Sequence, residues 1–217
     1  MSESLNEKDI PTRDSLLKQT IDNINRPKTS KGQNTFNNLV KAAEEIFGRK
    51  NYYRTSITEI TDKAGVAPGT FYLYFPDKKA IFRTLIWEIS IKLRQELQEA
   101  TLNLETRKEI EKEGFRAFFS FIKKHPGLYK IVWQAQFVDG KVFKEYYRNF
   151  ARGYQRNLKL AMKKGEFRQL NPEVIAYCLI GITNFVGLRW FIWEDAEISE
   201  DLLNDVMSFV FNGVAKD

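Results

Sequence analysis

The sequence predicts an all-α fold with two helical domains, and three observations support it. Apolar residues recur at helical spacing almost throughout, strand-like alternation is absent, and only 6 of the 217 residues are proline. The composition, 43% hydrophobic and 29% charged, indicates a globular chain with a core. We predict a polar tail over residues 1–29, a small helical domain over 30–83 and a larger helical bundle over 84–217.

The first part of the chain supports this division. The tail is predicted to be mostly disordered, with a short helix near residues 15–24. A helix then begins at Thr29 and ends near Gly48 and residues 51–53. Its buried face follows the i, i+3, i+4, i+7 pattern of an amphipathic helix and consists of Phe36, Leu39, Val40, Ala43, Ile46 and Phe47.

Two shorter helices and one long helix follow. Ser56, with Glu59 three residues later, forms a capping box at the start of the second helix. A short helix from Pro68 to Tyr74 comes after a glycine-containing turn, and Pro76 ends it. Asp77 caps a long helix that we expect to reach about Leu102 and to belong to both domains. Its apolar residues recur every four positions, at Ile81, Leu85, Ile89, Leu93 and Leu97.

The bundle is predicted to add five helices, at residues 106–124, 127–137, 140–165, 172–194 and 199–215, separated by Pro, Gly and Asn breaks. The apolar run 176–193 approaches the length of a membrane span. Arg189 within it would be costly in a bilayer, so we favour a buried interface helix and expect no membrane partner. Gly181 and Gly187 suggest a dimer contact on this helix, and its predicted partner face comprises Leu202, Val206, Phe209 and Val210.

Charge is concentrated in one block of the sequence. Residues 26–83 carry 11 basic and 5 acidic side chains, whereas residues 84–217 carry 20 basic and 18 acidic ones. Phosphate binding requires such a local excess of cations. A solvated basic surface without a partner explains the charge equally well, so charge alone leaves both interpretations open.

Several classes of function are disfavoured. The single cysteine, Cys178, cannot form an internal disulfide, and the polar N-terminus does not resemble a secretory signal. Both features favour a cytoplasmic protein. The single histidine, His125, is far from Cys178 in sequence, and no glycine-rich phosphate loop is present. We therefore expect no enzymatic activity, no metal site and no cofactor.

The sequence that carries most information is TDKAGVAPGTFYLYFPDK, residues 61–78. Two short helices joined by a tight glycine turn form the helix-turn-helix pattern. Gly65 permits a left-handed cap at the end of the first helix, and Val66 is predicted to fill the small core between the two helices. Gly69, Thr70 and Tyr72 then form a small polar front suited to a major groove, and Lys78 lies where a cation reaches a phosphate.

These residues resemble the DNA-binding domain of the TetR family of bacterial one-component regulators. The resemblance extends from Phe36 to Leu85, and two positions depart from the common pattern, Ala67 where serine is frequent and Pro76 where a more helical residue is usual. The matching residues are Ala43, Phe47, Ile57, Ile60, Ala64, Gly65, Val66, Gly69, Thr70, Phe71, Tyr72, Tyr74, Phe75 and Lys78.

The resemblance implies a homodimeric repressor that binds a roughly palindromic double-stranded DNA operator. It implies base or phosphate contacts by Gly69, Thr70 and Tyr72, a phosphate contact by Lys78, and backbone anchoring by Thr55 and Ser56. Either Thr55 or Ser56 is alternatively a helix cap, and Tyr74 is equally a core residue.

The resemblance also implies a small apolar or amphipathic effector bound in the second domain. Most of the chain's 30 aromatic residues lie in this domain, which suggests a cavity for an elongated or flat ligand, although ordinary core packing is the alternative for each ring. Residues 125–150 resemble a branch of the family associated with fatty acids or acyl-CoA. The candidate effector residues are Phe118, Trp133, Phe137, Tyr147, Phe150, Asn184 and Arg189.

Arg189 and Asn184 would orient a ligand headgroup or, alternatively, pair across the dimer. The competing hypothesis for the whole chain is a helical lipid-binding or partner-binding protein that does not read DNA.

Overall fold

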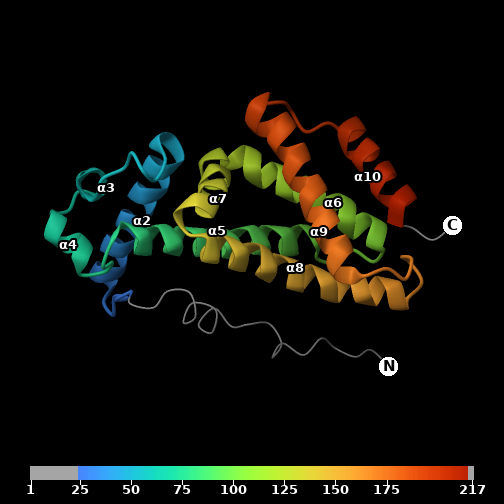
Figure 1. Cartoon of the computed structure of the whole chain (residues 1–217), viewed down its shortest axis with the longest axis horizontal. Coiled ribbons are helices and arrows are strands. Elements are labelled where there is room, and N and C mark those ends of the chain that lie inside the picture. The colour runs from blue at the N-terminus through green and yellow to red at the C-terminus, as the bar shows by residue number, and fades with distance from the viewer. Residues whose placement is uncertain (1–23, 215–217) are drawn as a thin grey trace. The chain divides into compact units, whose positions relative to one another are not determined.

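The computed structural model describes residues 24–214, and every regular element in that range is helical (Figure 1). The prediction of an all-α fold is confirmed. The chain divides into two compact units, residues 1–87 and 88–217. The helix expected near residues 15–24 lies almost entirely outside the described residues. Residues 24–29, which we assigned to the tail, are described and are not helical.

The first unit begins with helix α2 (Ser30–Lys50). The side chain of Thr29 caps this helix by accepting a hydrogen bond of 3.1 Å from the Gly32 amide. The six predicted core residues of α2 are all buried, together with Ala42. They form one core with Phe71, Phe75 and Phe82, which come from later elements and are fully buried.

The next two helices form the predicted helix-turn-helix. Helix α3 (Ile57–Ala64) starts with the capping box, in which the Ser56 and Glu59 side chains each accept from the other's backbone amide. It ends at Gly65, whose φ of +68° is the left-handed conformation that favours glycine. Helix α4 (Pro68–Tyr72) follows with proline in its first turn. It is one turn long, slightly shorter than predicted.

Helix α5 (Lys78–Thr101) runs without interruption across the boundary between the units, as the sequence predicted. The Asp77 carboxylate accepts a hydrogen bond of 2.7 Å from the Ala80 amide and so caps its start.

The second unit contains the five predicted helices, and apart from the end of α9 their ends lie within about two residues of those expected. Capping side chains set the starts of α6, α8 and α9: Thr106 and Glu109 form a second capping box, and Asp139 and Asn171 each accept two amide hydrogen bonds. The helices are α6 (Arg107–Lys124), α7 (Pro126–Val138), α8 (Gly140–Lys163), α9 (Pro172–Gly187) and α10 (Glu200–Val214).

The end of the α9 segment departs from the expected regular helix. From Leu188 to Trp193 it continues as a π-helix, η2. Gly187, just before it, allows α9 to approach α6 closely, because a Cβ there would lie 2.4 Å from Ile122 Cδ1. In η2, Phe191 is buried with its ring centroid 5.0 Å from that of Phe119.

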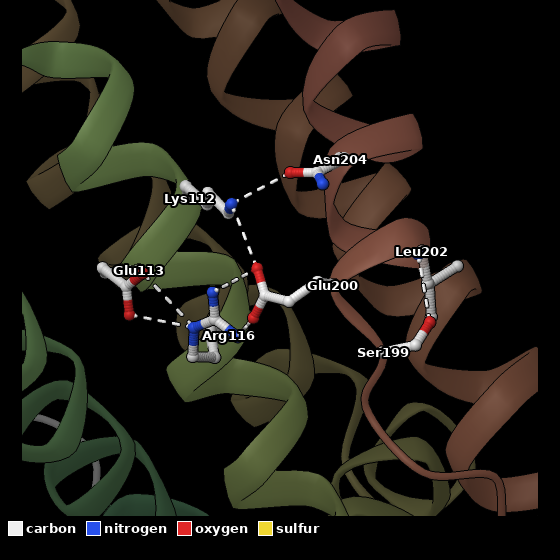
Figure 2. A network of polar contacts seen from close by, with 7 residues as sticks. All are labelled: Lys112, Glu113, Arg116, Ser199, Glu200, Leu202 and Asn204. Carbon is white, nitrogen blue, oxygen red and sulfur yellow. Dashed lines mark hydrogen bonds and ion pairs between the residues drawn. The ribbon is translucent and has the colours of Figure 1, made fainter.

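Polar contacts join the start of α10 to α6 (Figure 2). The Glu200 carboxylate accepts hydrogen bonds from both terminal guanidinium nitrogens of Arg116. It also forms an ion pair with Lys112, whose Nζ atom lies 3.2 Å away. Arg116 and then Lys112 lower the pKa of Glu200 to about 2. Lys112 also donates to Asn204 at 2.9 Å. These contacts fix which face of α10 is turned toward its own unit.

That orientation corrects the predicted dimer face. Val206 and Val210 are buried inside the unit, so they are not available to a partner chain, whereas Phe209 is 71% exposed. Gly187 serves the approach of α9 to α6, whereas a Cβ at Gly181 would meet no atom within 4 Å. The sequence pattern identified apolar faces correctly but not which of them face the protein's own core.

The segment Pro172–Trp193 is long and apolar enough to cross a membrane, by length and composition only. A third of its most apolar window is buried in the structure. Core helices of soluble proteins pass the same test, so this is weak evidence for a membrane span.

Candidate nucleic-acid interface

Helix α4 presents an exposed face that is held by a buried anchor. Phe71 is fully buried and packs against Phe75 with ring centroids 5.5 Å apart. Its neighbour Tyr72 is 58% exposed and Leu73 is 61% exposed. One turn of helix is thus fixed by Phe71 while the following two side chains point to solvent. Such a rigid, exposed helical edge is what major-groove reading requires.

Gly69 and Thr70 complete this face. A Cβ at Gly69 would meet no atom within 4 Å, so packing inside the chain does not require glycine there. Thr70 is half-buried, and its amide donates to the Ala67 carbonyl at 2.9 Å in the first turn of α4. The open space above Gly69 leaves room for another molecule to approach the backbone.

Thr55 and Ser56 are placed as structural residues. Thr55 is only 3% exposed, and its hydroxyl donates to the Asn51 carbonyl at 2.7 Å. Ser56 is exposed, but its hydroxyl oxygen accepts a hydrogen bond from the Glu59 amide in the capping box. A direct DNA contact by the Thr55 side chain would require this packing to open. The N-terminus of α3 remains exposed around Ser56.

Lys78 has an unexpected local role. Its ammonium group donates to the carbonyls of Tyr52 and Thr55, at 2.9 and 2.6 Å, and lies 4.4 Å from the centroid of the Tyr52 ring. Partial burial lowers the pKa of Lys78, and the Glu59 carboxylate opposes that shift. Lys78 therefore ties the first turn of α5 to the loop that precedes α3, and one of its three donor hydrogens remains for another acceptor.

Tyr74 lies within the first unit. It is half-buried, and its ring meets Phe36 edge-on at 5.9 Å. The Tyr74 carbonyl accepts a hydrogen bond of 3.1 Å from the backbone amide of Asn25. The side-chain amide of Asn25 donates a second one, of 3.0 Å, to the Leu73 carbonyl. The sequence did not reveal this contact, because no local pattern links positions 48 residues apart.

Three of the effector candidates come together in the second unit. Asn184 of α9 accepts from Tyr147 of α8 at its side-chain oxygen, at 3.4 Å, and from Tyr129 of α7 at its carbonyl, at 2.8 Å. Trp133 lies 6.2 Å, ring to ring, from both Tyr129 and Phe185. The Nε1 atom of Trp133 is buried and forms no regular hydrogen bond among the described residues, although the indole interacts with the Tyr129 hydroxyl and lowers its pKa.

The other four candidates are placed differently. Phe118 of α6 is buried beside Gly187, at the end of α9, as part of the core. Phe137 is 73% exposed. Arg189 is exposed and pairs with Glu194 at 3.0 Å, so its charge is already matched. Phe150 is half-buried on α8.

A cation that the sequence pattern did not reveal lies beside the aromatic group. Arg94 of α5 donates to the Ser90 hydroxyl at 2.7 Å and to the Ser90 carbonyl at 3.1 Å, and no carboxylate of the described residues pairs with it. Burial lowers the pKa of Arg94, and the nearby Tyr146 opposes that shift. The Tyr146 and Tyr147 ring centroids are 5.1 Å apart, which joins Arg94 to the Asn184 group.

Burial also sets the ionisation of this group. It raises the pKa of Tyr129 to about 12 and raises that of Tyr146 and Tyr147 further, so all three hydroxyls remain protonated at neutral pH. The Tyr129 and Tyr147 hydroxyls therefore keep the protons that they donate to Asn184. Among residues 24–214, no cluster of three His, Cys, Asp or Glu side chains is arranged to hold a metal ion.

Two helices joined at a left-handed glycine, the second with a rigid exposed face, define a helix-turn-helix DNA-binding transcriptional regulator. Residues 39–85 match the family model of the bacterial regulatory proteins of the tetR family. The chain is 30% identical over 183 residues to YdgC, an HTH-type transcriptional regulator of Bacillus subtilis (strain 168), a match that covers 81% of this chain and 92% of that relative. The chain belongs to the TetR family, whose members are transcriptional regulators and not enzymes.

Solved structures share the fold across nearly the whole chain. The fatty acid degradation regulator FadR of Bacillus halodurans superposes with a TM-score of 0.73 at 20% identity, covering 85% of this chain and 96% of that one. A TetR family transcription regulator of Marinobacter aquaeolei VT8 gives 0.72 at 12% identity, covering 86% and 98%. A Clostridium perfringens protein, designated a candidate regulator of fatty acid metabolism, gives 0.69 at 22%, covering 83% and 100%.

Proposed function

We propose that this protein is a homodimeric, cytoplasmic repressor that binds a roughly palindromic operator and responds to an apolar or amphipathic effector such as a fatty acid or acyl-CoA. The observation that carries the DNA-binding part is the α4 face, in which Tyr72 and Leu73 are exposed beside the buried anchor Phe71. We assign base contacts to Thr70 and Tyr72, backbone approach to Gly69, and helix-terminus contact to Ser56.

A two-fold dimer fits the exposed apolar residues of the second unit. On α9, Val174 and Phe185 are 55% and 63% exposed, and a side chain at Gly181 would point into open space. On α10, Phe209 is exposed beside the buried Val206. Apolar side chains exposed at helical spacing on two helices are typical of a four-helix interface between two copies.

The effector proposal rests on the group around Asn184. Trp133 and Tyr147 supply apolar surface with polar edges, and the buried Trp133 Nε1 donor interacts with the Tyr129 hydroxyl without forming a regular hydrogen bond. We assign the headgroup contact to Arg94, because Arg189, the sequence-based candidate, already pairs with Glu194. An organic anion with an apolar tail would satisfy both the guanidinium and the indole donor. The names of the Bacillus halodurans and Clostridium perfringens proteins point to the same ligand class.

The first experiment tests DNA reading. Purified protein is mixed with fragmented genomic DNA at physiological salt, the retained fragments are sequenced, and binding to a retained duplex is measured by fluorescence anisotropy. Tyr72→Ala should reduce affinity and alter sequence preference, since each good base contact contributes about 1–3 kcal/mol. The matched control is Leu160→Ala, another exposed apolar residue but on α8. Retention of no fragment would favour a helical lipid-binding or partner-binding protein instead.

The second experiment tests effector control on that duplex. Titration of a long-chain fatty acid, its CoA thioester and a neutral ester of the same acid should show release of DNA by one of the anions but not by the ester. Arg94→Gln should weaken the binding of that anion, whereas Arg189→Gln should leave it unchanged. Coupling must be reciprocal, so the duplex should weaken ligand binding by the same factor, about 5- to 150-fold. Equal ligand affinity with and without DNA would refute effector control.

A further inference from the structure

The residues just before α2 are fastened to the end of α4. The backbone amide of Asn25 donates to Tyr74, at 3.1 Å, and its side-chain amide donates to Leu73, at 3.0 Å. Leu73 is the last residue of the exposed α4 face, and Tyr74 follows it. The segment 24–31 therefore lies directly beside the proposed DNA-reading helix, although it falls outside the block 39–85 that defines the family match.

A second contact fixes the segment one turn further on. Pro27 is half-buried against the first turn of α2, where a Cβ on Gly32 would lie 2.8 Å from Pro27 Cβ and 3.1 Å from Thr29 Oγ1. Only glycine at position 32 allows this approach without a shift. Asn25 and Pro27 thus fix the chain on either side of Arg26, so the Arg26 backbone is preorganised for binding.

The side chains that this segment presents are cationic. Arg26, Lys28 and Lys31 are all exposed, and none of them forms an ion pair with a described residue. From Asn25 to Ala43 the sequence contains no aspartate or glutamate. Three cations on a fixed segment, unpaired with any acidic side chain that the structure describes, form a surface complementary to a polyanion.

We propose that Arg26, Lys28 and Lys31 bind the phosphate backbone of the same DNA duplex that α4 reads. This rests on the proposed function and adds to it a phosphate-binding segment, named here the α2 arm (residues 25–31). Phosphate contacts carry no sequence information but fix the register of the protein on the duplex. The arm positions α4 on the duplex, and the α4 side chains specify the sequence.

The test is the salt dependence of binding. For the full-length protein, log Kd is measured against log salt concentration on a retained operator duplex and on an unrelated duplex of equal length. The triple variant R26Q/K28Q/K31Q should lower the slope by up to about 5 on both duplexes, since each phosphate contact contributes about 0.9 and a dimer carries two arms. The ratio of the two affinities should stay within about twofold.

The matched control is K130Q/K141Q/K159Q, which removes the same charge from exposed positions of the second unit. It should leave the slope nearly unchanged. A second variant, Gly32→Ala, keeps every charge but displaces Pro27. It should weaken binding to both duplexes and leave the ratio of the two affinities unchanged. Circular dichroism melting of each variant shows whether the first unit remains folded.

The outcomes separate the arm from the proposed function. If the arm variant and the control have the same slope, the arm is not a phosphate-binding segment, even where operator reading holds. If the arm variant lowers the slope on both duplexes but the wild-type protein does not distinguish them, the arm stands and sequence-specific reading fails. If the wild-type protein binds neither duplex at low salt, both proposals are overturned.

Discussion

The two units of this protein carry their candidate sites in different ways. In the first unit, the exposed α4 face is built by neighbours in sequence: Phe71 is the anchor, and Tyr72 and Leu73 are the exposed edge. In the second unit, the group around Asn184 is assembled from α5, α7, α8 and α9, and its hydrogen bonds span up to 55 residues. A site of the first kind tolerates surface substitution without a loss of fold, whereas a site of the second kind is also part of the core.

This difference leads to a first, large expected effect within a single helix. Phe71→Ala removes a fully buried ring and should destabilise the first unit by about 3–5 kcal/mol, and DNA binding should disappear with it. Tyr72→Ala should weaken DNA binding and alter its sequence preference while the melting temperature stays within about 1 °C, as expected for an exposed residue. Thermal unfolding and anisotropy on the same samples measure both. Equal losses of stability would show that the α4 face is not an independent surface.

A second pair of substitutions tests the corrected dimer face on α10. Val206→Asp places a charge in the core of the second unit and should cost about 2–4 kcal/mol of stability. Phe209→Asp changes an exposed residue and should convert the dimer to a folded monomer. Sedimentation velocity with a parallel melting curve distinguishes the two. A stable dimer for Phe209→Asp would remove this residue from the interface.

How much of each unit could be predicted follows from the range of its interactions. The capping box of Ser56 and Glu59 and the cap at Gly65 are local, and the sequence predicted both correctly. Val206 was misassigned because the core face and a partner face are both apolar, and sequence periodicity does not distinguish them. Arg94 was missed because its role depends on the absence of a nearby carboxylate, which only the packed helices reveal.

Lys78 shows how the two kinds of interaction meet at one residue. The sequence placed it at the DNA backbone, whereas its ammonium already bonds to carbonyls 23 and 26 residues earlier. Lys78→Met keeps the apolar stem and removes the donors, so it should destabilise the first unit by about 1–2 kcal/mol. The slope of log Kd against log salt then separates the two roles. A fall of about 1 for each protomer of the dimer indicates a phosphate contact in addition, and an unchanged slope indicates an anchor alone.

The smallest expected effect compares the two capping boxes. Glu59 bonds to Ser56 and to Lys50, with Lys50 the larger influence, and its pKa falls from 4.5 to about 2. Glu109 bonds only to Thr106, which also lowers its pKa.

In both cases the folded pKa lies below the unfolded value. The contribution to stability is therefore complete above about pH 5 and is lost as the pH falls toward the folded pKa. Glu59→Gln and Glu109→Gln remove the charge in one unit at a time and keep a side chain that accepts the backbone hydrogen bond. At pH 7 each should lower the melting temperature slightly, and Glu59→Gln more so because it also loses Lys50.

Between pH 5 and pH 2 the difference from wild type should shrink for both variants and persist to lower pH for Glu59→Gln. Added salt should reduce the Glu59 effect at pH 7 and change the Glu109 effect less, because only Glu59 has an exposed cationic partner. Melting curves at four pH values and two salt concentrations measure this. A Glu59→Gln deficit that is independent of both pH and salt would show that the cap, without the ion pair, accounts for the role of this carboxylate.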